Sequence, residues 1–169
     1  YPSKMAPNLA QINQGQYQQC IDTLSKDQRS ANYELFAAEL GRVQQLSANY
    51  SASTATFMPL MGKVEADQLQ AKITVTDTLN QAGSLATNDN AIPYQLASYE
   101  IVFLYEYQAL NFIAQGNISD ALVAARKSNN LQAYLAQQYQ KQLAKAQEQA
   151  QQNMLNPSKS INNQTPTTG

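Results

Sequence analysis

The sequence predicts an all-α fold in which antiparallel helix pairs stack as a repeat array, and two observations support this prediction. Apolar residues recur at helical spacing along most of the 169 residues. A short phrase also occurs three times, starting at Gly15, Ala48 and Gly116, and consists of a tight turn, a Tyr or Ile anchor and a small residue three positions later. The copies start 33 and 68 residues apart, close to one and two periods of a roughly 34-residue helix-turn-helix repeat.

The first helix pair is predicted around the first copy of the phrase. Residues 1–13 indicate a short first helix, and Gly15 marks the turn. Four residues then fall at i, i+3, i+4 and i+7 on one helix face, namely Tyr17, Cys20, Ile21 and Leu24. We expect the second helix to break at residues 25–27.

The second pair is predicted as a helix over residues 29–47, a turn at Ala48-Asn49 and a second helix from Tyr50. Gly41 lies seven residues before the turn, where a small residue lets two antiparallel helices approach closely, next to Ser53 on the partner helix.

Ala109 and Ala121 hold the equivalent places in the last pair. Small residues at these facing positions are what the repeat requires, because bulky groups at both places would push the helices apart.

The middle of the chain departs from the repeat. We expect Pro59 and Gly62 to interrupt the helix that starts at Tyr50, and a separate helix to follow over residues 62–81. Residues 83–92 are polar and predict the longest loop, at a place where a further repeat would otherwise stand.

The last pair is predicted to begin at Pro93, which suits a first helical turn. Gly116 forms the turn, and Ser119-Asp120 are the expected cap of a long final helix over residues 119–154. Beyond Leu143 this helix is rich in Ala and Gln and has almost nothing to bury. The domain prediction is therefore a helical domain over residues 1–155 and a flexible tail or linker over residues 156–169.

Tyrosines are the candidate binding residues. Tyr94, Tyr99, Tyr105 and Tyr107 are denser than helix packing requires, and tyrosine is favoured at partner-binding surfaces. The alternative is plain interhelical packing, since tyrosine joins apolar area to a hydroxyl group. Both interpretations stay open on the sequence alone.

The composition argues against an enzyme, a metal protein and a nucleic-acid-binding protein. The chain has no histidine, a net charge of −1 without a basic block, and one cysteine. Cys20 occupies the small-residue position of the repeat, so we interpret it as a small buried hydrophobe. We expect no cofactor and no catalytic residue, and no run of apolar residues is long enough to span a membrane. Because the chain opens on Tyr1 rather than Met, we expect a processed product or a piece of a longer protein, with a possible lipid anchor upstream.

The turn–Tyr–small pattern resembles the tetratricopeptide class, with Tyr105 in the place of that class's early tryptophan. The closing proline of that class is missing from all three copies. A narrower resemblance covers residues 33–46, 50–57, 99–110 and 121–132, which are similar to an uncharacterised family of tetratricopeptide-like lipoproteins of the Gram-negative envelope.

This resemblance implies the N-terminal portion of a longer repeat protein, located in the periplasm or at the inner face of the outer membrane. It carries over no functional residue. Ala125 stands where the family has an acidic residue before the basic pair.

The function that follows is a non-enzymatic scaffold that binds other proteins of the bacterial envelope. Two alternatives stay open. The residues between Tyr94 and Tyr107 could form a groove for a peptide or a glycan, or the chain could be a structural subunit that assembles through its Gln-rich C-terminal helix.

Overall fold

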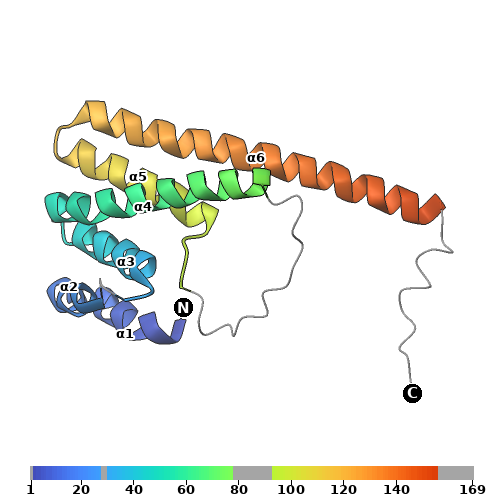
Figure 1. The fold of residues 1–169 in the computed structure, drawn as a ribbon. Coiled ribbons are helices and arrows are strands. Elements are labelled where there is room, and N and C mark those ends of the chain that lie inside the picture. The colour runs from blue at the N-terminus through green and yellow to red at the C-terminus, as the bar shows by residue number, and fades with distance from the viewer. Residues whose placement is uncertain (1, 28–29, 78–92, 156–169) are drawn as a thin grey trace, which may run out of the picture. The chain divides into compact units, whose positions relative to one another are not determined.

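The chain is mostly helical in the part that the computed structural model describes, which is residues 2–27, 30–77 and 93–155 (Figure 1). Those residues form six α-helices and one short 3-10 helix, without a strand among them. The chain divides into two compact units, Tyr1–Asn129 and Asn130–Gly169. No helix in the described part is long and apolar enough to cross a membrane. The predicted loop over residues 83–92 and the predicted tail over residues 156–169 lie outside the described residues.

In the first unit, successive helices pack on one another in chain order (Figure 1). The helices are α1 (Pro2–Asn13), α2 (Tyr17–Leu24), the 3-10 helix η1 (Ser25–Asp27), α3 (Tyr33–Leu46), α4 (Tyr50–Asp77), α5 (Ser98–Ala114) and the beginning of α6 (Ile118–Leu155). The break at residues 25–27 and the boundaries of the first two helices follow the sequence prediction closely. The third helix begins at Tyr33 rather than at residue 29, because residues 30–32 form a bend and a turn.

The three copies of the phrase fold as the same helix-ending turn. Backbone hydrogen bonds join Gln16 N to Gln11 O at 2.8 Å, Asn49 N to Gln44 O at 2.9 Å and Asn117 N to Phe112 O at 2.8 Å. This is the bond that closes a Schellman motif, which needs a left-handed residue just past the helix end. Gly15, Ala48 and Gly116 supply it, with φ of 72°, 60° and 74°.

Asparagine caps the helix that follows two of these turns. Asn49 Oδ1 accepts the backbone N–H of Ala52 at 3.2 Å, and Asn117 Oδ1 accepts that of Asp120 at 3.2 Å. A side-chain oxygen at this position satisfies one of the unpaired N–H groups of the first turn. The prediction that Ser119-Asp120 would cap the last helix is therefore wrong in its residue, because the cap lies two positions earlier.

The predicted interruption at Pro59 and Gly62 is also wrong, since α4 runs unbroken from Tyr50 to Asp77. A proline inside a helix leaves the carbonyl four residues earlier without its N–H partner. Here Ala55 and Pro59 are both exposed, so water reaches that carbonyl. Gly62 is exposed as well, and no neighbouring atom lies within 4 Å of the position of a Cβ there. The helix continues through it.

Helix α5 begins at Ser98 rather than at the predicted Pro93, and residues 93–97 are not helical. Side chains from α3 and α5 take up the backbone N–H groups of this segment. Asn32 Oδ1 accepts from Tyr94 at 3.0 Å, Glu34 Oε2 accepts from Leu96 at 2.8 Å, and Glu100 Oε2 accepts from Ala97 at 2.8 Å. These bonds replace the ones that a helical turn would have made.

Close contact between α3 and α4 depends on a small residue at position 41. Ser53 Oγ donates a 2.7 Å hydrogen bond to the carbonyl of Gly41, so the structure places these two residues in direct contact. The Phe57 ring fills the remaining space, since a Cβ built on Gly41 would lie 2.2 Å from its Cε1 atom. Ala109 and Ala121, the equivalent positions in the last pair, are both buried.

Helix α5 sits on both α3 and α4 through a buried polar network. Gln45 Nε2 donates to Asn111 Oδ1 at 2.7 Å and to the carbonyl of Tyr107 at 2.8 Å, and Asn111 Nδ2 donates to Ser53 Oγ at 2.7 Å. Because buried polar groups destabilise a fold when they lose their partners, this network fixes the register of α5.

Helix α5 runs parallel to α3 and antiparallel to α4, because its N-terminal end lies at the N-terminal end of α3 and its C-terminal part lies at the C-terminal end of α3. Leu96 lies at Glu34 and Tyr107 at Gln45, each 62 residues further along the chain.

The second unit contains the later part of α6. None of its described side chains, from residue 130 to residue 154, is buried. Tyr139 is 63% exposed and Leu143 41% exposed. This agrees with the expectation that the Gln-rich part of the helix has almost nothing to bury.

Candidate functional site

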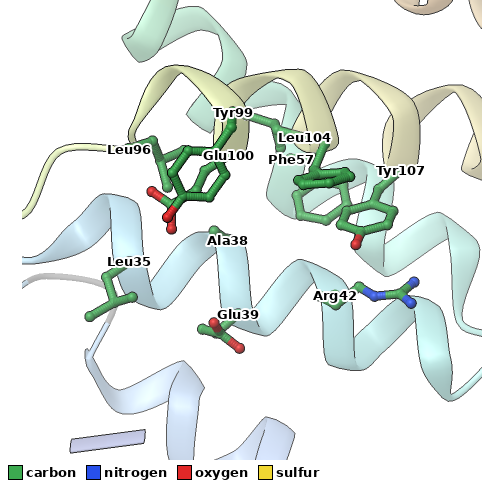
Figure 2. Close-up of a pocket in the computed structure, with 11 residues that line it drawn as sticks. Leu35, Ala38, Glu39, Arg42, Phe57, Leu96, Tyr99, Glu100, Leu104 and Tyr107 are labelled. Atoms are coloured by element: carbon green, nitrogen blue, oxygen red, sulfur yellow. The ribbon is translucent and has the colours of Figure 1, made fainter. Parts of the chain in front are cut away.

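A groove runs between α3 and α5 in the first unit (Figure 2). Its volume is about 270 Å³. Phe57 and Leu104 form its floor and are 1% and 3% exposed. Pockets for drug-sized ligands measure about 300–1,000 Å³, so this groove suits one or two side chains better than a whole small molecule.

The α5 side of the groove is aromatic and partly exposed. Tyr99 is 64% exposed and Phe103 is 48% exposed, and Tyr107 completes the row at helical spacing. The rings of Phe103 and Tyr107 are stacked, with centroids 6.1 Å apart and planes 18° from parallel. Large aromatic groups at the rim of an apolar groove are typical of protein-binding surfaces.

The α3 side contributes a charge of each sign. The guanidinium carbon of Arg42 lies 4.3 Å from the centroid of the Tyr107 ring, within the range of a cation–π contact, and Figure 2 shows the two side chains facing each other. Arg42 also donates to Gln45 Oε1, which links the groove to the polar network of α5. Glu39 lines the same side one turn earlier. A ligand would therefore meet an apolar floor with both an acid and a base beside it.

Of the four tyrosines predicted to bind, the structure places only Tyr99 and Tyr107 in the groove. Tyr94 packs against the core cluster of α1, α2 and α3, and its hydroxyl donates to both carboxylate oxygens of Glu100, at 2.7 and 2.8 Å. Burial, this hydrogen bond and the charge of Glu100 raise the pKa of Tyr94 well above its usual range. Tyr94 therefore holds the start of α5 in place.

Tyr105 lies outside the groove and is 4% exposed. Its hydroxyl donates to Glu65 on α4 at 3.2 Å, and Glu65 also forms a 2.6 Å ion pair with Lys127 on α6. Burial, followed by the charge and the hydrogen bond of Glu65, raises the pKa of Tyr105. The structure thus gives Tyr105 the packing role that the sequence left open. The ion pair between Lys127 and Glu65 joins α6 to α4 beside this hydroxyl.

The other residues taken from the repeat lie at turns or in the core. Tyr17 and Tyr50 begin α2 and α4 and are half-buried. Cys20 is fully buried, and its thiol points at the carbonyl of Asn8 at 3.9 Å. Burial, with a smaller contribution from the charge of Glu39, raises the pKa of the Cys20 thiol, which keeps it in the unreactive protonated form. In the described part of the chain, His, Cys, Asp and Glu side chains form no cluster of three that could hold a metal ion.

Sequence reasoning missed the α3 side of the groove and its floor. Neither Arg42 nor Phe57 is among the tyrosines that the sequence singled out, so the aromatic pattern gave no signal for them. Three hydrogen bonds hold α5 and the segment before it against α3 and its N-cap, and each joins residues 62 apart in the chain.

No family model, no curated protein and no solved structure matches this chain.

Proposed function

We propose that this chain is a non-enzymatic helical-repeat scaffold of the bacterial envelope, which holds a segment of another protein in the groove between α3 and α5. In this proposal the three helix pairs stack in a tetratricopeptide-like manner. The identical turns at Gly15, Ala48 and Gly116 support that arrangement, because each joins two consecutive helices by the same hydrogen bond.

The observation that carries the proposal is the row of exposed aromatic side chains beside the buried apolar floor of the groove. Tyr99 and Phe103 together leave large apolar area in contact with water, beside a floor of fully buried Phe57. Hot spots of protein interfaces combine such aromatic anchors with arginine, and Arg42 stands beside Tyr107. The fitting ligand is a peptide segment with one or two apolar side chains and polar groups beside them.

Selection from a displayed peptide library tests this proposal. Peptides enriched on the wild-type chain are measured against Phe103→Ser, which removes a groove ring, and against Arg42→Ala. Met58→Ser is the matched control, because Met58 is a similarly exposed apolar side chain, 50% exposed, on α4 and outside the groove.

We expect both groove variants to lose at least about tenfold in affinity, the loss of one good contact, and the control to bind like the wild type. Failure to enrich any peptide, or equal binding by all variants, would show that the groove is not a peptide site.

A glycan is the second candidate, and the exposed ring of Tyr99 favours it, because sugar rings stack on flat aromatic faces. Cell-wall fragments would then shift the thermal unfolding of the wild-type chain and leave that of Tyr99→Ala unchanged. No shift with either protein would dismiss the glycan.

A further inference from the structure

The outer side of the last helix pair in the first unit carries an apolar surface. Leu110 and Ile113 on α5, and Ile118 and Leu122 on α6, are 54%, 54%, 56% and 52% exposed. We call these four residues the end face. All four lie within six residues of Gly116, on the two helix ends that this turn joins, so the exposed aliphatic side chains are concentrated there rather than scattered.

The residues at the equivalent positions around the preceding turn, at Ala48, show what kind of element packs on such a face. The second and third turns lie 68 residues apart, and shifting the end face back by 68 gives Arg42, Gln45, Tyr50 and Thr54. Each of these contacts α5. Arg42 lies over the ring of Tyr107, Gln45 donates to Asn111, and Gln115 Nε2 donates to the carbonyl of Tyr50 at 3.4 Å and to Thr54 Oγ1 at 2.9 Å. The end face therefore corresponds to the positions that bind a following helix in the preceding pair.

The chemistry of the end face specifies the helix that would fit it. In the preceding pair, the hydrogen bonds are made by the backbone carbonyl of Tyr107, the side chain of Asn111 and the side chain of Gln115, which directly follows α5; the three residues are spaced by four. The side chains of the end face are aliphatic and offer no hydrogen bond. A helix seated there needs apolar residues at i, i+4 and i+8, because a polar side chain would be buried without a partner.

The second unit carries a helix stripe with this spacing. Leu131, Leu135, Tyr139 and Leu143 follow one another at intervals of four, and none of them is buried. In the single chain Leu131 and Leu135 are partly buried, whereas Tyr139 is 63% and Leu143 41% exposed. The second half of the stripe and the end face are therefore available to another copy.

We propose that the end face of one copy receives helix segment 131–143 of a second copy. A stable, specific interface removes about 1,200–2,000 Å² from water, more than one short helix on four side chains provides. We therefore expect the exchange in both directions, which gives a dimer with two equivalent contacts and two-fold symmetry.

The mass of the full-length chain in solution is the first test. Sedimentation equilibrium over a concentration series is expected to reach twice the 18.6 kDa of one chain. Leu122→Glu on the end face and Tyr139→Glu on the stripe are each expected to give monomers, because both place a charge in an apolar contact. Val123→Glu is the matched control, since Val123 adjoins Leu122, is 48% exposed and lies off the end face. Unchanged helical circular dichroism confirms that each variant is folded.

Disulfide trapping is the second test and identifies the two surfaces. In a Cys20→Ala background, a Leu122→Cys chain is mixed with a Tyr139→Cys chain and oxidised. We expect a disulfide that joins the two different variants, and none when Val123→Cys replaces Leu122→Cys. A wild-type chain that stays monomeric at every concentration would overturn the proposal. A dimer that survives Leu122→Glu would overturn it as well, because segment 131–143 would then be pairing elsewhere.

Discussion

Two glycines inside helices are expected to respond in opposite directions to the same substitution. A methyl group at Gly41 would lie 2.2, 2.5 and 2.8 Å from three atoms of the buried Phe57 ring. A methyl group at Gly62 would meet nothing within 4 Å. Both positions are in helices, so alanine improves the helix propensity equally at both. The difference between the two variants therefore isolates the contact between α3 and α4.

The magnitudes follow from two opposing terms. Alanine in place of glycine stabilises a helix interior by about 0.5–1 kcal/mol, and this is the whole expected effect of Gly62→Ala. Overpacking a well-packed core destabilises by about 1–3 kcal/mol, and a 2.2 Å approach to a ring with 1% exposure belongs near the upper limit. For Gly41→Ala we expect a net loss of about 2 kcal/mol.

Thermal unfolding followed by circular dichroism measures both effects. In a chain of this size, about 1 kcal/mol shifts Tm by roughly 2–4 °C, so Gly41→Ala should lower Tm by roughly 4–8 °C and Gly62→Ala should raise it by roughly 1–4 °C. A Phe57→Leu background should reduce the loss caused by Gly41→Ala, because the two residues are in contact. If Gly41→Ala raised Tm as Gly62→Ala does, the packing of α3 on α4 through this glycine would be refuted.

Three further outcomes are expected. Asn117→Ala removes the cap of α6 and should lower the free energy of unfolding by about 0.5–2 kcal/mol in urea titrations, while Asn117→Ser retains most of it. Glu34→Ala leaves the backbone N–H of Leu96 without its buried acceptor, whereas the exposed Lys63 keeps its ion pair with Asp67. The same titration should show a loss of about 1–3 kcal/mol; no loss would mean that residues 93–97 are held by other contacts. The pKa values of Tyr94 and Tyr105 are raised in the folded chain, so above about pH 10, the ordinary tyrosine pKa, the unfolded state ionises first and stability falls as pH rises further. Urea midpoints measured from pH 8 upward should decline above about pH 10, and replacing both tyrosines with phenylalanine should reduce that decline, to which the raised pKa values of Tyr33 and the Cys20 thiol also contribute.

Local features of the fold could be predicted from the sequence because short-range chemistry determines them. The turns at Gly15 and Gly116 need a left-handed residue, and glycine adopts that conformation without a steric penalty. The first helices follow from apolar spacing, which the structure reproduces in the bounds of α2. The error at Pro59 has an equally local cause, since the sequence does not show that its side of α4 faces water.

The groove could be predicted only in part, because it depends on contacts between residues far apart in the chain. The high frequency of tyrosine in this segment correctly indicated Tyr99 and Tyr107. It also indicated Tyr94 and Tyr105, which lie outside the groove and hydrogen-bond to Glu100 and Glu65. The choice between a packed and an exposed tyrosine depends on which helix lies opposite. Which helix lies opposite depends on contacts between α3 and α5, such as the hydrogen bond from Gln45 to Tyr107, whose residues are 62 apart in the chain.

The most direct test of the proposed scaffold is site-specific photo-crosslinking in the envelope of living Gram-negative cells. A photoreactive phenylalanine analogue replaces Tyr99 in the groove or, as the control, Met58 on α4. The groove hypothesis predicts one defined protein crosslinked at position 99, its loss when Phe103→Ser is added, and no such product at position 58. Equal crosslinking at both positions, or a product at position 99 that persists with Phe103→Ser, would contradict it.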